Sequence, residues 1–200
     1  MKMYEMTVKI TFTDSVLGSL PGNKEIFVDH VAGNPDTVNE EMENIRPADP
    51  DEVIEKATTI FAKTADGRPF FYDYQLRGYF KEACKFLKKV DKTLSSKEKA
   101  YKQKIDGMIF VKDRENIIDL NGKELDYCER PLRASTPQGE RVALARSESA
   151  AEGSTCTFTV QVLEEKDLEL VGEWLDYGRF HGTGQWRNSG HGRFTWEVIV

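Results

Sequence analysis

The stretch M-T-V-K-I-T-F-T, residues 6–13, determines how the chain begins to fold. Apolar and polar residues alternate in it, with Met6, Val8, Ile10 and Phe12 on one side and Thr7, Lys9, Thr11 and Thr13 on the other. Strict alternation is the period of a β-strand with one buried face. The sequence therefore predicts that the fold opens with a strand that packs one face against a core.

Outward from this strand, the same patterns predict the other elements. Helical spacing predicts a short helix ending at Gly33, a clear helix over about 72–90 and a last helix over about 167–178. Strand patterns cover 107–112, 115–120, 155–163 and 194–200, and Asp66-Gly67 marks a hairpin turn. This order predicts an α+β fold, with helices packed on one face of a largely antiparallel sheet.

Length and charge limit the domain organisation. A chain of 200 residues with 39% hydrophobic content is expected to form a single domain over 1–200. The net charge is −6, and residues 34–56 hold eight carboxylates against Arg46 and Lys56, so the rest of the chain is close to neutral. We expect this acidic insertion to be a solvated loop or a weakly ordered segment.

The chain shows no sign of a membrane segment or a disulfide framework. It has no signal-peptide pattern and no run of about 18 apolar residues. Its three cysteines, Cys84, Cys128 and Cys156, are widely separated and odd in number, which argues against both disulfides and a zinc knuckle. We expect a cytoplasmic protein, bacterial or in the host cytoplasm if phage-encoded, that does not bind a membrane.

A glycine-rich stretch, G-T-G-Q-W-R-N-S-G-H-G-R-F, covers residues 182–194 just before the last strand. Glycine permits positive φ and close backbone approach, so main-chain amides could reach a phosphate, while arginines add bidentate donors. The candidate RNA-binding residues here are Gly182, Gly184, Trp186, Arg187, Gly190, His191, Gly192 and Arg193, with Arg179 and His181 nearby. The alternative is structural: the glycines let the loop pass close to the preceding helix, and Trp186 fills the edge of the core.

Two further basic regions are candidates for binding phosphate. A hairpin over about 128–148 carries Arg130, Arg133, Arg141 and Arg146, which either grip RNA or pair with neighbouring glutamates. The helix over about 72–90 carries Arg77, Lys81 and Lys85 outside its apolar stripe, followed by more lysines. This charged run is either a solvated face or a sequence-independent phosphate surface.

These motifs together resemble the RAMP superfamily of CRISPR-associated proteins. The matching residues are Leu76, Gly78, Phe80 and Lys81 on the helix, and Gly182, Gly184, Arg187, Gly190, Gly192, Arg193 and Phe194 in the loop. The resemblance implies a ferredoxin-like, or RRM-like, fold and an RNA partner such as a single-stranded crRNA. The acidic balance and short length depart from that family and are what a solitary or phage-encoded relative would show.

Little in the sequence indicates catalysis. Repeat-processing RAMP nucleases often use a histidine near the first helix, and His30 lies in that region, although a helix-surface histidine is the alternative. No metal-ligand spacing, Walker loop or nucleophile elbow is present, so we expect no cofactor and no metal site.

The sequence therefore predicts a non-catalytic RNA-binding protein, a subunit or relative of a CRISPR-type ribonucleoprotein that assembles as a homo- or hetero-oligomer. A second hypothesis is a protein-interaction module, phage-encoded, whose acidic segment docks a basic partner. A third is a metal-independent endoribonuclease that uses His30 as its base.

Overall fold

The computed structural model describes residues 2–22, 58–136 and 139–199, with side chains outside 132–143. The predicted helix ending at Gly33, His30 and the acidic insertion 34–56 lie outside these described residues. In the described part, no helix is both long enough and apolar enough to span a bilayer.

The main sheet is antiparallel and has the order β12-β1-β11-β8-β6-β5, with β7 also pairing β11. Its strands are β1 (Tyr4–Phe12), β5 (Ala62–Lys63), β6 (Pro69–Tyr72), β7 (Ile109–Val111), β8 (Glu115–Asp119), β11 (Thr155–Val162) and β12 (Phe194–Val198). Helix α4 (Asp73–Leu87) precedes β7 and β8, and α6 (Asp167–Tyr177) connects β11 to β12. In a ferredoxin-like β-α-β-β-α-β unit, the strands lie side by side in the order fourth, first, third, second. Strands β12, β1, β11 and β8 follow this order, so the prediction of an α+β, ferredoxin-like fold is confirmed.

The predicted alternation of the first strand sets the register of the sheet centre. Strand β1 pairs β11 antiparallel, so that Val8 lies opposite Phe158 and Ile10 opposite Cys156. These four side chains are buried, while Lys9 and Thr157, which lie between them, belong to the other face. The hydrophobic core therefore lies between this sheet and the helices.

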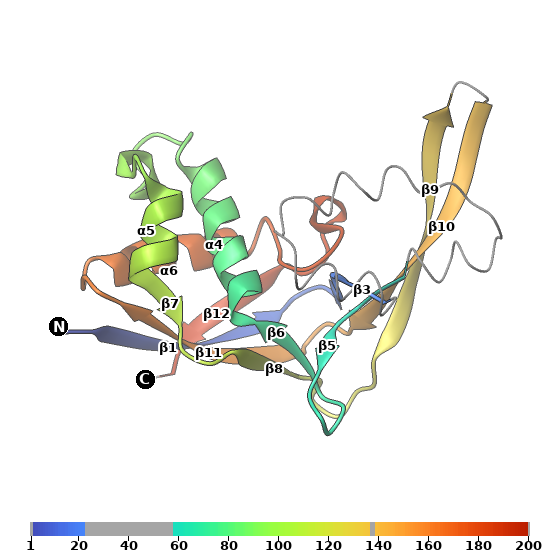
Figure 1. Ribbon diagram of the computed structural model, residues 1–200, viewed down its shortest axis with the longest axis horizontal. Helices are drawn as coiled ribbons and strands as arrows, with labels where there is room; N and C mark the ends of the chain where they lie inside the picture. The colour runs from blue at the N-terminus through green and yellow to red at the C-terminus, as the bar shows by residue number, and fades with distance from the viewer. Residues whose placement is uncertain (1, 23–57, 137–138, 200) are drawn as a thin grey trace.

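The three α-helices of the described part, α4, α5 (Tyr101–Met108) and α6, lie on the same face of the sheet (Figure 1). Helix α4 buries Leu76, Tyr79, Phe80, Ala83 and Cys84 on the predicted stripe. The helix ends at Leu87, earlier than the pattern predicted, and Val90 beyond it is 52% exposed. The helix is followed by a 3-10 turn, η2 (Ser95–Lys97), and by helix α5 (Tyr101–Met108). Neither element was predicted from the sequence pattern.

A second sheet carries the arginine hairpin. It has the order β2-β10-β4-β3, with β9 pairing β10. The strands are β2 (Val16–Leu17), β3 (Leu20–Pro21), β4 (Thr58–Ile60), β9 (Asp126–Thr136) and β10 (Gly139–Ala150). The hairpin of β9 and β10 projects away from the helical layer, as Figure 1 shows. Both predicted hairpins form, since β5 and β6 also pair around Asp66-Gly67.

Candidate nucleic-acid interface

The glycine-rich loop lies between the helical layer and the β9–β10 hairpin (Figure 1), and its backbone is packed against itself. A Cβ on Gly192, which has a φ of 71°, would lie 1.9 Å from the Thr183 carbonyl oxygen. A Cβ on Gly182 would lie 2.2 Å from the Gly192 carbonyl carbon. Only glycine fits both positions, because the two ends of the loop touch through their main chains.

The loop is also fastened to β2. A Cβ on Gly184 would lie 2.5 Å from the Leu17 carbonyl oxygen, and the Gln185 amide donates to that oxygen at 3.1 Å. The Gly192 amide donates to the Ser15 carbonyl at 2.9 Å. These close approaches are the structural use of glycine that the sequence left open.

Several loop amides are therefore not available to a phosphate. Besides Gln185 and Gly192, the amides of Thr183, Ser189, Gly190 and Phe194 donate to carbonyls of the protein. The expected cradle of free amides does not form at these positions, because tight packing of the loop consumes their donors. A ligand contact at these six positions must therefore rely on side chains.

The arginines of the loop lie against carboxylates. Arg187 pairs with Glu82 of α4, and His181 Nε2 lies 3.1 Å from the same carboxylate, without hydrogen-bond geometry. Burial opposes ionisation of Glu82, but the contact with His181 and the charge of Arg187 outweigh burial, so the pKa of Glu82 is lowered. This half-buried cluster ties the loop to α4.

Two further arginines have carboxylate partners at the surface. Arg193 Nε donates to Asp14 Oδ2 at 2.8 Å and to the Gly190 carbonyl at 3.2 Å. Arg179 lies 3.6 Å from Asp176. The hydrogen bond that Arg193 donates to Asp14 raises the pKa of Arg193, so this guanidinium stays charged. Both pairs are exposed enough for water and salt to weaken them.

Trp186 is the exposed aromatic residue of the loop. It adopts a φ of 55°, is 37% exposed and stacks on His191 with ring centroids 5.1 Å apart and planes 19° apart. The guanidinium carbon of Arg130, from β9, lies 4.7 Å from the indole centroid. His191 Nδ1 in turn lies 3.0 Å from the Ser15 hydroxyl. We call Trp186, His191 and Arg130 the Trp186 cluster.

The positive charge of Arg130 has no carboxylate partner among the described residues. It is 6% exposed, its Nη1 donates to the Ser147 hydroxyl at 3.1 Å, and its Nε has no hydrogen-bond partner. No carboxylate of the described residues pairs with it. Burial lowers the pKa of the Arg130 guanidinium, since removing a cation from water is unfavourable.

The other hairpin arginines divide into two groups. Arg146 Nε lies 3.4 Å from Glu129, and its guanidinium carbon lies 3.8 Å from the Tyr127 ring centroid, as the local-pairing alternative predicted. Arg133 and Arg141 belong to the paired strands, opposite Val142 and Ala134. Their side chains lie outside the described part of the structure.

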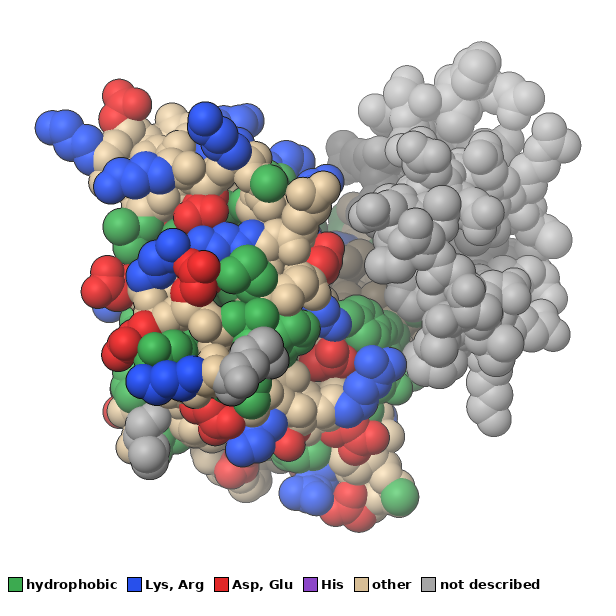
Figure 2. Space-filling view, turned by 60° about the vertical axis from the view of Figure 1, so that its left-hand side comes forward, with side chains coloured by type: hydrophobic (Ala, Val, Ile, Leu, Met, Phe, Trp, Pro, Cys, Tyr) green, Lys and Arg blue, Asp and Glu red, His purple; other side chains and the backbone are tan. Residues whose placement is uncertain are grey.

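Two of the three helix cations pair with carboxylates of the helical layer. Arg77 pairs with Asp73 at 2.9 Å and Lys81 with Asp106 at 2.7 Å, whereas Lys85 is exposed beside Phe86. Figure 2 shows lysine and arginine side chains interspersed with aspartate and glutamate over the face that it draws. The visible face therefore has mixed charge rather than one continuous basic patch.

Sequence reasoning missed the carboxylates that hold the predicted cations. Glu82, Asp14 and Asp106 are each close to their partners only in space, with Glu82 and Arg187 105 positions apart. A local pattern carries no signal for such pairs. Asp73 is the exception, because its spacing of four residues from Arg77 on one helix is readable from sequence.

The helix-free face of the two central strands differs from the usual RRM surface, in which aromatic residues of the sheet stack bases. On β1 and β11 this face carries Thr7, Lys9, Thr11, Thr155, Thr157, Thr159 and Gln161. These two strands offer no aromatic residue there. The Trp186 cluster is thus a more suitable candidate for contact with nucleic acid.

Comparisons with known proteins gave structural similarity only. No family model matches the chain, and no curated protein matches it. The chain is similar to a chain of the solved structure described as "Type IV-B CRISPR Complex", with 12% identity, a TM-score of 0.49 and coverage of 98% of this chain and 91% of that one. It is also similar to a chain of the "Cryo-EM structure of the Type III-B Cmr-beta bound to cognate target RNA", with 8% identity and a TM-score of 0.48. That similarity covers 100% of this chain, which spans 60% of the length of the other.

Proposed function

We propose that this protein binds single-stranded RNA, without cleaving it, as a subunit or relative of a CRISPR-type ribonucleoprotein complex. The contact surface consists of the Trp186 cluster and the arginine-bearing hairpin. The CRISPR context rests on the resemblance of the helix and loop motifs to the RAMP superfamily.

The observation that carries the proposal is the buried guanidinium of Arg130, which has no carboxylate partner among the residues that the structure describes. An isolated buried charge is unfavourable, so such groups usually acquire a counter-ion. A phosphate suits this position because guanidinium binds phosphate oxygens through two parallel hydrogen bonds. The Nε of Arg130 is a buried donor without a hydrogen-bond partner among the described residues, so its hydrogen-bonding capacity is not used within that part of the protein.

The neighbouring side chains agree with a polynucleotide rather than a free anion. Trp186 presents an exposed aromatic surface beside Arg130, and His191 lies against it. Stacking of one base on an aromatic side chain contributes about 1–3 kcal/mol. Because His191 and Arg130 already lie over the indole, a base must displace one of them or stack at the uncovered part.

Fluorescence anisotropy with a labelled single-stranded RNA tests this proposal. We expect native protein to bind with an affinity that falls as salt rises, and Arg130→Gln to reduce the slope of log K against log salt by about 0.7. Trp186→Ala is expected to weaken binding about 5- to 150-fold, the equivalent of one lost stacking contact.

Arg68→Gln is the matched control, because it removes one exposed arginine from the β5–β6 turn, away from the cluster. It should leave both affinity and slope close to native values. If RNA does not bind, or if Arg68→Gln and Arg130→Gln weaken binding equally, the proposed site is wrong.

The assignment to a CRISPR-type complex has its own test. RNA that copurifies with tagged protein from its native cells should be enriched in short repeat-derived transcripts. Enrichment of no RNA class over a tag-only control would contradict this part of the proposal.

A further inference from the structure

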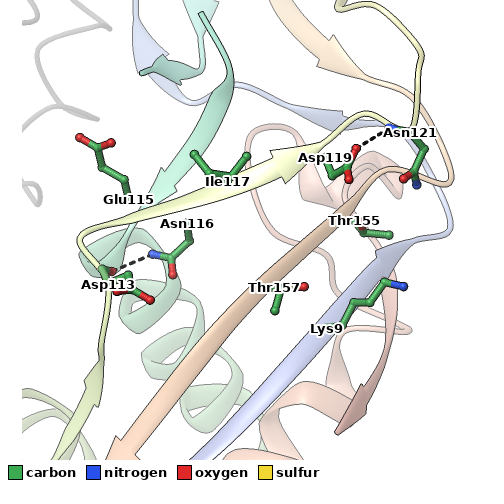
Figure 3. Close-up of a pocket in the computed structure, with 9 residues that line it drawn as sticks. All are labelled: Lys9, Asp113, Glu115, Asn116, Ile117, Asp119, Asn121, Thr155 and Thr157. Carbon is green, nitrogen blue, oxygen red and sulfur yellow. Dashed lines mark hydrogen bonds between the residues drawn. The ribbon is translucent and has the colours of Figure 1, made fainter. Parts of the chain in front are cut away.

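A pocket of about 590 Å³ opens on the helix-free face of the main sheet, where β8 separates from β11 (Figure 3). Strand β11 pairs with β8 only at Thr155 and Cys156, and with β7 from Val160 onward. The intervening stretch of β11 therefore lacks a continuous strand neighbour on this side. Thr155 and Thr157 line the pocket from β11.

The rim of this pocket is acidic. Asp113, Glu115 and Asp119 line it from β8 and the turn before it, against the single ammonium of Lys9. The Lys9 ammonium lies 3.7 Å from the carboxylate of Glu197, a residue that does not line the pocket. No lysine, arginine or histidine of the described residues pairs with these three carboxylates. Their combined field repels phosphate and attracts a cation.

Asn116 gives an independent indication of a missing ligand. Its side chain is 2% exposed and projects into the gap between β8 and β11 in Figure 3. Its Nδ2 donates to the Phe71 carbonyl at 3.2 Å and to the Asp113 carbonyl at 3.0 Å, which fixes the orientation of the amide. Its Oδ1 has no hydrogen-bond partner, and a buried acceptor without a donor is unfavourable.

These features call for a cation with several N–H donors. An arginine side chain has five donors and no acceptor, so it can serve the Asn116 amide oxygen, the rim carboxylates and the threonine hydroxyls together. Its aliphatic stem can pack on Ile117, which also lines the pocket. A metal ion fits less well, because no group of three or more histidine, cysteine, aspartate or glutamate residues in the described part could hold one.

We infer that this pocket binds an arginine side chain of a protein partner. The partner docks on the helix-free face of the sheet, whereas the Trp186 cluster lies at the loop and the hairpin. This inference does not depend on RNA binding. It assigns a protein-docking role to a surface whose charge excludes nucleic acid.

NMR titration of the ¹⁵N-labelled full chain with N-acetyl-L-arginine amide tests the inference. We expect saturable shifts of the Thr155, Thr157 and Ile117 backbone amides and of the Asn116 side-chain amide. The expected Kd is about 1–10 mM, since a ligand with so few heavy atoms gains little binding free energy. Glu115→Gln with Asp119→Asn should weaken binding about two- to tenfold, because partly exposed ion pairs are modest.

The double variant Glu165→Gln with Glu169→Gln is the matched control, since it neutralises two exposed carboxylates of the α6 region. It should bind the arginine amide as the native protein does. Absence of saturable shifts at the pocket, or equal weakening in both double variants, would overturn the inference.

Two more titrations separate arginine from other cations. Mg²⁺ is expected to produce no saturable shift at these amides. If Mg²⁺ saturates them and the arginine amide does not, the site is a metal site instead. If spermidine shifts them at lower concentration than the arginine amide, and the pocket double variant abolishes this, then the ligand is a free polyamine and the assignment to a protein partner is wrong.

Discussion

At the scale of single residues, Arg130 and Glu82 are both charged groups shielded from water, but they differ in whether a neighbour compensates the charge. Glu82 is in contact with Arg187 and His181, and these contacts more than compensate its burial. Arg130 has an indole and a serine hydroxyl but no described anion. The first arrangement is expected to stabilise the fold, whereas the second lowers stability in the absence of ligand.

Replacing Arg130 by methionine is therefore expected to stabilise the protein while it weakens RNA binding. Methionine keeps much of the side-chain volume and removes the cost of burying the charge. A gain of about 1 kcal/mol would raise the Tm by about 2–4 °C in a chain of this size. Thermal denaturation followed by circular dichroism measures the change. A clear fall in Tm would mean that the guanidinium is a structural element rather than a ligand-binding one.

Glu82→Gln is expected to lower the free energy of unfolding at pH 7 by about 1–2 kcal/mol, between the values for exposed and buried pairs. The pKa of Glu82 is lower in the folded than in the unfolded state, so its contribution is present above the unfolded pKa of about 4.3. That contribution is lost as the pH falls through the folded pKa. Urea denaturation from pH 7 down to about pH 3 should show native and variant proteins converging. A difference that does not change with pH would contradict this assignment.

At the scale of elements, the glycine-rich loop is a packed connection whose backbone touches both itself and β2. Its glycines differ in what a side chain would meet. Gly192 faces a carbonyl oxygen at 1.9 Å, whereas a Cβ on Gly190 would approach only the Arg193 side chain, at 3.5 Å. A side chain therefore has no room at Gly192, whereas Gly190 leaves room for one.

A set of three glycine-to-alanine variants tests this gradient. Gly192→Ala is expected to cost more than about 2 kcal/mol, because the clash is with backbone and φ is positive. Gly190→Ala should cost about 1 kcal/mol, from its positive φ. Gly78→Ala, exposed on α4 with open space around it, should stabilise by about 0.5–1 kcal/mol. Chemical denaturation ranks the three, and a harmless Gly192→Ala would contradict the packing described here.

At the scale of the whole molecule, a ferredoxin-like body carries a projecting hairpin. Among the described residues, the outer part of β9 and β10 pairs only within the hairpin, while β2 and β4 pair with β10 near its base. Because the core lies in the body, the outer hairpin contributes little to it. The hairpin is therefore available as a binding arm.

Shortening this arm separates binding from folding. We expect replacement of residues 133–142 by Asn-Gly, which joins the paired residues Leu132 and Ala143, to change the Tm by no more than about 4 °C. RNA affinity should fall, because Arg133 and Arg141 are removed. Calorimetry and fluorescence anisotropy on the same preparation measure both. Unchanged RNA affinity would exclude the outer hairpin from the interface.

Much of the fold was predictable because its signals are local. Alternation over 6–13 and the apolar stripe of α4 each reflect one element meeting one core. Helix α5 was not predicted, since Ile105 is its only buried residue and a lysine-rich stretch with one apolar anchor has no clear period. Among the candidate site residues, the sequence supplied the cations and the local partner Glu129 of Arg146, but not the distant carboxylates Glu82, Asp14 and Asp106.

The sequence by itself determined the order of the main strands and of the helices α4 and α6, and the face that β1 and α4 bury. These properties depend on residues within a few positions of one another, so a linear pattern contains them. Only the tertiary structure decided that the loop glycines pack against β2, that Arg187 is neutralised while Arg130 is not, and that an acidic pocket opens between β8 and β11. Those outcomes depend on which distant groups meet, and burial then sets the free energy of each charge.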